Sequence, residues 1–337
     1  MNRPLKAVFF FIALSFIAVP VIGQKPAANK EIVPQKGYQE LKAAESPELR
    51  ILLEKAVNSA LSKYPTGTFK DGEIAATLID LSNPKNINRA DYHGDLKLYP
   101  ASVVKMFYLA ALERQLEDGK MTMTSELARA LTNMIVDSSN DATHYVLDAL
   151  TGTSGGVELP SAEFEVWQYK RNRVNRYFSA MGYANINVNQ KTFEEDAYGV
   201  EQQSRNFPTE AANRNKLTTN ATARLMAEIV LGRIAGPAGT AKALELLKRD
   251  PFAATTDQED QAHGFTGRML IDRKLTDVKI WSKAGWTSKS RHDAAYLETP
   301  DGLRFVLVVF TENHANERDP IPTIAGKVLD GLREMKK

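Results

Sequence analysis

The order of strand and helix signals constrains the fold of this 337-residue chain more than any other feature. Apolar runs typical of strands occur near the start, at Ile74–Leu81, and near the end, at Val278–Ser282, Ala294–Leu297 and Phe305–Phe310. Between them the apolar residues recur at helical spacing. The simplest arrangement is an α/β (α+β) fold, in which both chain ends form one antiparallel sheet flanked by helices and an all-helical part is inserted.

Several boundaries follow from local signals. Ser46 and Pro47 predict a helix start, since Ser is a favoured N-cap and Pro a favoured first residue. A second short strand is expected at Gly94–Leu98, and the Pro-Asp-Gly turn before Leu303 predicts a hairpin. The other predicted helices begin near Ala101 or span Ser125–Val136, Asp141–Ala149, Glu163–Met181, Thr222–Ile234 and Ile321–Met335. The polar, aperiodic stretch Gly182–Lys216 is predicted to be a long functional loop.

The N-terminus has the pattern of a secretory signal. Arg3 and Lys6 precede the apolar stretch Ala7–Val19, and Gly23 offers a small residue for cleavage. The stretch is short for a membrane-spanning helix, so we expect export to the periplasm or beyond without stable membrane insertion, an uncleaved anchor being the alternative. The predicted organisation is a signal peptide at 1–23, a linker at 24–45 and a catalytic domain at 46–336. Its sheet part covers about 46–100 and 265–336, and its helical part about 101–264.

Composition excludes several classes of protein. Without Arg3 and Lys6 the chain carries 41 basic and 41 acidic residues, which disfavours nucleic acid as the main partner. There is no cysteine, so disulfides, thiolate metal sites and lipid attachment through cysteine are excluded. The five histidines show no metal-binding spacing. We therefore expect no metal and no cofactor.

A nucleophile is suggested by Ser102 and Lys105, three residues apart at a predicted helix start. Residues at this spacing share a helix face. A buried Lys has a lowered pKa and can take the proton of a Ser hydroxyl, which makes the oxygen nucleophilic. Backbone N–H groups at a helix start can also stabilise an oxyanion. The pair alone also fits a helix-start Ser beside a solvated Lys.

Two further motifs change that interpretation. Ser138-Ser139-Asn140 follows a predicted helix, and Lys283-Ala284-Gly285 follows a predicted strand. Ser-x-x-Lys, Ser-x-Asn and Lys-x-Gly, in this order, resemble the motif set of class A β-lactamases and penicillin-binding proteins, serine acyltransferases that form one superfamily. The resemblance extends over roughly residues 46–336.

The resemblance implies a role for each matching residue. Ser102 would form an acyl-enzyme, Lys105 would be its base or proton relay, and Ser138 would pass a proton to the leaving nitrogen. The implied substrate-binding residues are Asn140, Lys283, Gly285, Trp286 and Thr287, of which Trp286 would share the oxyanion hole with the backbone of Ser102. The implied activity is hydrolysis of a β-lactam amide by a class A type β-lactamase.

The chain departs from the family pattern at two places. The middle residue of the third motif is usually Thr or Ser and binds the substrate carboxylate, but here it is Ala284. Thr287 or Ser288 could substitute from a shifted position. The Glu-x-x-Leu-Asn pattern that supplies the deacylation base in class A enzymes is missing. Counting along the loop gives three candidate bases, with Glu195 slightly favoured: Glu194, Glu195 and Glu201.

These departures leave other functions open. A D-alanyl-D-alanine peptidase or an esterase on the same fold would not need the loop Glu, and a sensor would acylate and stop. A small-molecule substrate is expected in each case, either a β-lactam or a peptide resembling a peptidoglycan stem, with the chain acting as a monomer.

Three other features of the sequence have a possible functional meaning. Gly152-Thr153-Ser154-Gly155-Gly156 matches a nucleophile elbow, but it follows a predicted helix and is interpreted as a helix stop. His292 could line the site, because it lies close to the third motif. The basic run Lys170–Arg176 is interpreted as a solvated helix face.

Overall fold

The computed structural model describes residues 31–193 and 196–336. The predicted signal peptide and two of the three candidate bases, Glu194 and Glu195, lie outside these residues. None of the described helices is long and apolar enough to span a membrane.

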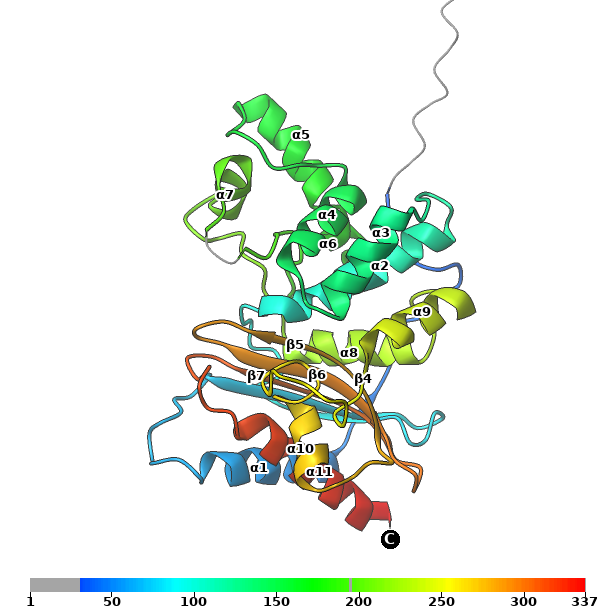
Figure 1. Cartoon of the computed structure of the whole chain (residues 1–337), viewed down its shortest axis with the longest axis vertical. Coiled ribbons are helices and arrows are strands. Elements are labelled where there is room, and N and C mark those ends of the chain that lie inside the picture. Colours follow the sequence, from blue (N-terminus) through cyan, green and yellow to red (C-terminus); the bar gives the residue numbers. More distant parts are fainter. Residues whose placement is uncertain (1–30, 194–195, 337) are drawn as a thin grey trace, which may run out of the picture. The chain divides into compact units, whose positions relative to one another are not determined.

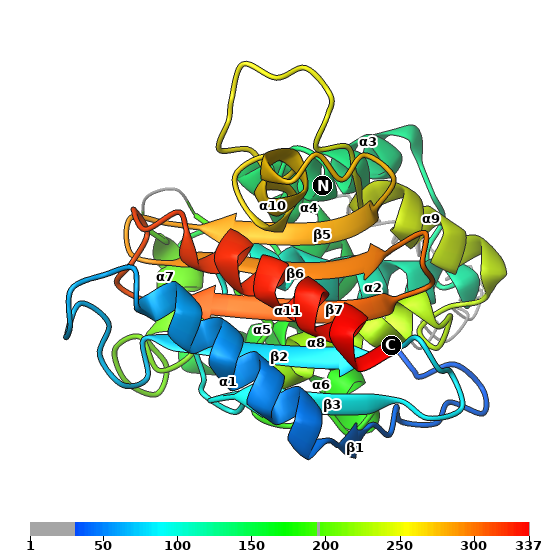
Figure 2. The ribbon, with the colours of Figure 1, turned by 90° about the horizontal axis from the view of Figure 1, so that it is seen from below.

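Within the described residues, seven strands form one sheet in the order β1-β3-β2-β7-β6-β5-β4 (Figure 2). All neighbouring strands are antiparallel except β1 and β3. The strands are β1 (Ala44–Glu45), β2 (Ile74–Asp80), β3 (Asn88–Tyr92), β4 (Lys248–Arg249), β5 (Lys279–Trp286), β6 (Arg291–Glu298) and β7 (Arg304–Thr311). Strands from both chain ends are thus adjacent at the pair β2–β7, which confirms the predicted sheet.

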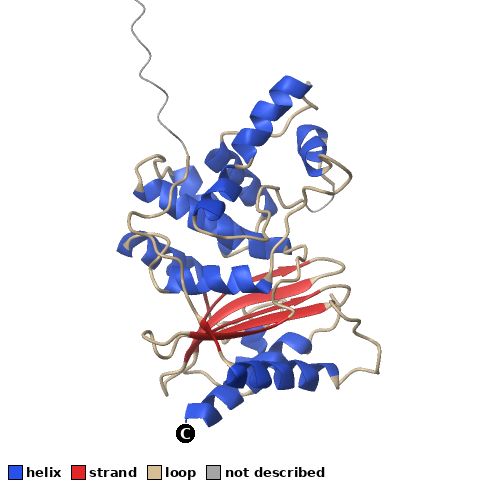
Figure 3. Ribbon diagram, turned by 180° about the vertical axis from the view of Figure 1, so that it is seen from behind, coloured by secondary structure: helices blue, strands red, loops and turns tan. Residues whose placement is uncertain are grey.

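Helices cover both faces of the sheet (Figures 1 and 3). The terminal helices pack against one face together with α10, while α8 lies on the other face with the remaining helices beyond it. The helices are α1 (Pro47–Leu61), α2 (Lys105–Glu117), α3 (Ser125–Ile135), α4 (Asn140–Thr151), α5 (Ser161–Arg171), α6 (Arg173–Ala180), α7 (Gly199–Arg205), α8 (Thr219–Val230), α9 (Pro237–Leu247), α10 (Thr266–Asp272) and α11 (Pro320–Lys336). One apolar core lies on each side of the sheet.

Two local predictions were wrong, and a third was incomplete. The strand expected at Gly94–Leu98 is instead Asn88–Tyr92, whose mostly polar, half-buried residues lack an apolar signal. The helix expected at Glu163–Met181 is divided at Asn172 into α5 and α6. The loop Gly182–Lys216 contains the short helix α7. Strand β3 is defined by its pairing with β2, which outweighs its polar local pattern.

The polar segment expected to be a linker is bound to the fold from residue 31 onward. We call residues 31–45 the N-terminal strap. It buries Ile32 and Leu41, and β1 pairs with β3. The strap is also held by Glu228 of α8, which is 0 % exposed and accepts hydrogen bonds from Tyr38 Oη at 2.8 Å and Leu41 N at 3.0 Å.

Candidate active site

Ser102 lies at the start of a helix that packs directly against β5. A single 3-10 turn, Ala101–Val104, precedes α2, and Ser102 is half-buried. A Cβ added at Gly285 would lie 2.7 Å from Ser102 N and 2.9 Å from Pro100 O. Only glycine permits this approach, so the third motif requires its Gly for a packing reason.

His292 of β6 contacts the backbone of the segment before Ser102. This imidazole is 0 % exposed; its Nε2 lies 2.9 Å from Tyr99 O, and its Nδ1 accepts from Thr311 N at 3.1 Å. Burial lowers the pKa of His292 to about 4. The sequence suggested that His292 could line the site. The structure instead places it beneath the segment that leads to Ser102, which it supports.

Lys105 begins α2 and is 0 % exposed. Its ammonium donates to the carbonyl oxygen of Ser138 and to Asn140 Oδ1 at 2.9 Å, and lies 3.3 Å from Ser138 Oγ. The residues of the first and second motifs therefore meet, although 33 positions separate Lys105 from Ser138.

Ser138 links the second motif to the third. It has a φ of 59°, an uncommon conformation for a residue with a Cβ, in the connection between α3 and α4. Ser139 caps α4 by accepting from Ala142 N at 3.2 Å. Lys283 Nζ donates to Ser138 Oγ at 2.9 Å. The Ser138 hydroxyl therefore lies between two lysine ammonium groups.

The charge around this hydroxyl is predominantly positive. Lys283 is 0 % exposed, and its pKa is lowered well below the usual range by burial, by Lys105 and by Arg249 of β4. Asp293, opposite Ala284 in the sheet, is the acidic group that acts on Lys283. Burial raises the pKa of Asp293. Lys283 thus holds its proton less tightly than an exposed lysine, and an anionic substrate group nearby would favour its charged form.

Ala284 and Trp286 belong to β5, and Thr287 follows the end of this strand. Trp286 is 42 % exposed. Thr287 Oγ1 accepts from the backbone N–H groups of Lys289 and Ser290, so it stabilises the β5–β6 turn. Ala284 is buried in the apolar core between the sheet and the terminal helices.

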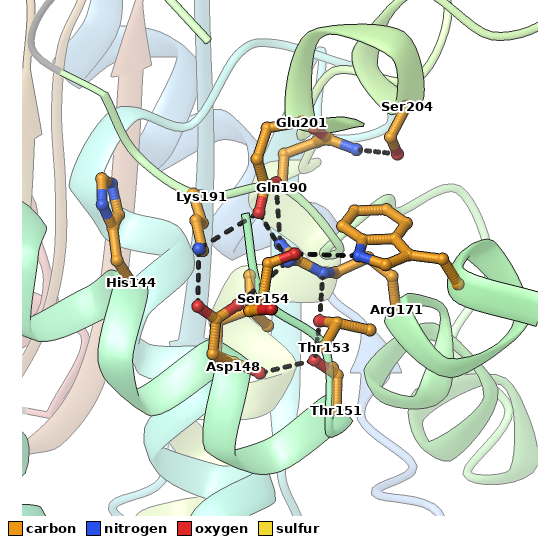
Figure 4. Close-up of polar contacts among 12 residues, drawn as sticks. His144, Asp148, Thr151, Thr153, Ser154, Arg171, Gln190, Lys191, Glu201 and Ser204 are labelled. Carbon is orange, nitrogen blue, oxygen red and sulfur yellow. Dashed lines mark hydrogen bonds and ion pairs between the residues drawn. The ribbon is translucent and has the colours of Figure 1, made fainter. Parts of the chain in front are cut away.

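Glu201, a candidate base, is committed to a buried ion-pair network. It is 3 % exposed and accepts from Arg171 at 2.6 and 3.0 Å, and its carboxylate lies 3.1 Å from Lys191 Nζ. Asp148 of α4 completes the network by pairing with Arg171 and Lys191 (Figure 4). Both oxygens of the Glu201 carboxylate are therefore engaged within the network. The placement corrects the expectation that Glu201 is available as a base.

Two other sequence predictions concern residues near this network. The basic run Lys170–Arg176 is not a solvated face, because Arg171 is 0 % exposed and Arg173 is 8 % exposed. The Gly-x-Ser-x-Gly segment ends α4: Gly152 has a φ of 65° and is the C-cap. The carbonyl oxygen of Ser154 accepts from Trp167 Nε1 at 3.0 Å (Figure 4). The structure therefore confirms a helix stop here.

Gln261 is a residue of the site that sequence analysis missed. Its side chain contacts Lys283 and the end of α3. It lies in an irregular polar segment between β4 and α10, without a motif or a period. No sequence signal distinguishes it from the other polar residues of that segment. Among the described residues, no group of three or more His, Asp or Glu side chains could hold a metal ion.

The geometry agrees with the comparison to known families. A model described as the Beta-lactamase enzyme family matches residues 122–330. The chain belongs to this family. The match begins after Ser102 and Lys105, so the first motif lies outside it. The family and the fold indicate a serine hydrolase-like enzyme. No curated protein matches the chain.

Solved structures show the same fold as this β-lactamase family member. The β-lactamase of Sphaerobacter thermophilus DSM 20745 is 18% identical, with 84% of this chain and 96% of that chain covered and a TM-score of 0.58. PBP-A is 17% identical, with 88% and 100% covered and a TM-score of 0.58. The β-lactamase of Chitinophaga pinensis DSM 2588 is 17% identical, with 83% and 99% covered and a TM-score of 0.59. At these identities the likeness shows the fold alone.

Proposed function

We propose that this protein is an exported class A type serine β-lactamase that opens the β-lactam amide through an acyl-enzyme on Ser102. The observation that carries the proposal is the cluster of Lys105, Ser138 and Lys283 beside the helix start that bears Ser102. The side-chain nitrogens of Lys105 and Lys283 lie 3.3 and 2.9 Å from the Ser138 hydroxyl oxygen. This arrangement suits proton transfer near an anionic substrate.

The acylation step follows from these positions. Ser102 Oγ attacks the lactam carbonyl carbon, and its proton passes to Lys105 in the unprotonated state. Backbone N–H groups of Ser102 and Trp286 stabilise the oxyanion. When the tetrahedral intermediate collapses, the carbon–nitrogen bond breaks and a proton passes through Ser138 to the leaving nitrogen. Lys283 attracts the substrate carboxylate, and the Asn140 amide can donate to the substrate's amide side chain.

Deacylation is proposed to be slow. Hydrolysis needs a water and a base within hydrogen-bond reach, roughly 2.6–3.2 Å. Because Glu201 is paired with Arg171 and Lys191, the base is assigned to Glu194 or Glu195, with Glu195 favoured. We expect the acyl-enzyme to accumulate during turnover.

The ion pairs that Glu201 forms with Arg171 and Lys191 also support a second candidate function. A D-alanyl-D-alanine peptidase or esterase, or a sensor that stops at the acyl-enzyme, needs no loop base for β-lactams. PBP-A has this fold, and its L158E mutant is described as an acyl-enzyme complex with penicillin G. Turnover of the acyl-enzyme separates the two functions.

Intact-mass analysis after incubation with penicillin G tests the acylation step. The wild type should gain the mass of the drug on a peptide that contains Ser102, and Ser102→Ala should gain none. Lys105→Ala should acylate ~100-fold more slowly or worse. Ser154→Ala is the matched control and should react normally. An adduct that persists in Ser102→Ala would refute the proposal.

A time course of the same adduct tests deacylation. Glu195→Gln or Glu194→Gln should prolong the adduct in single-turnover experiments, whereas Glu201→Gln should lower stability more than it changes adduct lifetime. If no variant prolongs it, the peptidase or sensor function is favoured. Fast turnover without detectable adduct would show that deacylation is not impaired.

Export is proposed from the N-terminal pattern alone. The mature protein should begin near Gln24 in the periplasm or medium and should be a monomer. N-terminal sequencing of protein from a cell envelope tests the cleavage, and a sequence beginning at Met1 would contradict it. Sedimentation of the purified protein tests the monomer.

A further inference from the structure

Gln261 forms a bridge between the second and third motifs. Its side chain is 6 % exposed and lies between β5 and the C-terminal end of α3. Oε1 accepts from Lys283 Nζ at 2.5 Å and from Ala284 N at 3.3 Å. Nε2 donates to the carbonyl oxygens of Ile135 at 3.1 Å and Val136 at 2.8 Å. All the polar atoms of the amide are therefore used.

The orientation of this amide is dictated by its partners. A main-chain carbonyl oxygen can only accept, so the NH2 group must face Ile135 and Val136. The amide oxygen then faces Lys283, which can only donate. A side chain with both a donor pair and an acceptor is required here, and glutamine has the necessary length.

The bridge controls where the Lys283 ammonium points. This ammonium donates to Gln261 Oε1, to Ala284 O at 2.9 Å and to Ser138 Oγ at 2.9 Å. Three acceptors use all three of its N–H groups. With Gln261 Oε1 and Ala284 O bound to two of these N–H groups, the third meets Ser138 Oγ.

The same amide also restrains Ser138. Val136 lies two residues before Ser138, which has a φ of 59° in a connection that local preference does not favour. Gln261 thus contacts Lys283 through its oxygen and, through its NH2 group, the backbone that leads into Ser138. The position of the Gln261 side chain can therefore set the distance between Lys283 Nζ and Ser138 Oγ.

The backbone at Gln261 is itself held by its neighbour. Asp260 Oδ1 accepts from Ala262 N at 2.7 Å and from His263 N at 3.0 Å. Thr255 Oγ1 donates to Asp260 Oδ2 at 3.1 Å. These contacts support the segment without reaching Lys283, so Thr255 provides a control for loop stability.

We propose that Gln261 is a positioning residue that holds Lys283 against Ser138, and so sets the rate of Ser102 acylation without touching the substrate. This inference rests on the proposed function of the site. The charged groups that act on Lys283 are Lys105 of α2, Arg249 of β4 and Asp293 of β6. A neutral amide adds no charge to this set, whereas a carboxylate at 261 would favour the ammonium form of Lys283.

The test is the second-order rate of acylation by penicillin G, followed by intact mass across pH. Gln261→Met keeps the side-chain length but cannot hydrogen-bond, so acylation should be roughly 10- to 100-fold slower, the range for a lost hydrogen bond to a charged group. Gln261→Glu keeps an acceptor for Lys283. It should lose less activity, and the alkaline limb of its pH profile should move to higher pH.

Thr255→Val is the matched control and should acylate at nearly the wild-type rate, while thermal melting shows that each variant is folded. A wild-type rate in Gln261→Met would overturn the inference, as would a Gln261→Glu pH profile that does not move. Crystal structures of wild type and Gln261→Met provide a readout independent of activity. The Lys283 Nζ to Ser138 Oγ distance should lengthen from 2.9 Å, and an unchanged distance would contradict the inference.

If the wild type forms no adduct at all, the proposed acylation fails. The structural comparison still tests whether Gln261 holds Lys283. The two failures are therefore distinguishable.

Discussion

His292 Nε2 lies 2.9 Å from the carbonyl oxygen of Tyr99, in the segment that leads to Ser102. Nδ1 accepts from Thr311 N at 3.1 Å, so Nδ1 is unprotonated and Nε2 carries the proton of a neutral ring. The imidazole therefore connects β6 and β7 to the segment before the candidate nucleophile. A protonated ring would lose the hydrogen bond from Thr311.

The first prediction concerns acid stability. The pKa of His292 is about 4 in the folded protein, against 6.5 for an unperturbed histidine. Below pH 6.5 the unfolded chain takes up a proton that the folded state resists, so stability falls until the pH reaches about 4. The contribution between pH 6.5 and 4.5 is on the order of 2–3 kcal/mol. Urea unfolding should show a shallower pH dependence for His292→Gln than for wild type, and equal slopes would contradict this.

The second prediction concerns the close packing of β5 on the helix start. In Gly285→Ala the new Cβ would lie 2.7 Å from Ser102 N, so the strand or the helix must shift. We expect acylation by penicillin G to fall about 100-fold, since small displacements of reacting groups have effects of this size. Gly156→Ala is the control, because no atom lies within 4 Å of a Cβ there. Equal rates for the two variants would show that the contact is not needed.

The third prediction concerns the buried network in Figure 4. Arg171 is 0 % exposed and pairs with Asp148 and Glu201. Arg171→Met leaves two carboxylates with one fewer cation, and losing one partner of a buried pair costs about 3–5 kcal/mol. Urea unfolding measures the loss. Arg129→Met, which removes an exposed pair with Glu126, should unfold almost like wild type.

The fourth prediction concerns the N-terminal strap. Glu228 accepts from Tyr38, Leu41 N and Tyr183, and pairs with Arg224. Glu228→Ala leaves these donors without their acceptor and should lower the free energy of unfolding by about 3–5 kcal/mol. Hydrogen exchange should show faster exchange at Leu41, with β7 less affected. Unchanged exchange at Leu41 would indicate that the apolar contacts of the strap hold it without Glu228.

Much of the architecture could be read from the sequence, because it is encoded locally. The strands at β2 and β7 carry continuous apolar runs, and Ser46 accepts from Leu49 N at 3.2 Å as its N-cap position predicts. The three motifs could be assigned because each is short and contiguous. Their convergence followed from the resemblance, and the structure supplies the distances within the cluster.

Other features depend on contacts between residues far apart in the chain. Strand β3 is half-buried and polar, so only its pairing with β2 defines it. Arg171 carries a charge that suggests solvent, yet its partner Glu201, 30 residues away, makes burial possible. Hydrophobic periodicity and helix propensity depend on nearby residues, so they do not reveal such a distant partner.

The supporting residues of the site show the same division. Lys105, Ser138 and Lys283 belong to short motifs that are visible in the amino-acid sequence. Gln261 and His292 acquire their importance from Lys283 and Tyr99, at separations of 22 and 193 residues. A hydrogen bond depends on where two atoms lie in space, so the polar side chains that support the site are defined by the folded chain and not by local sequence.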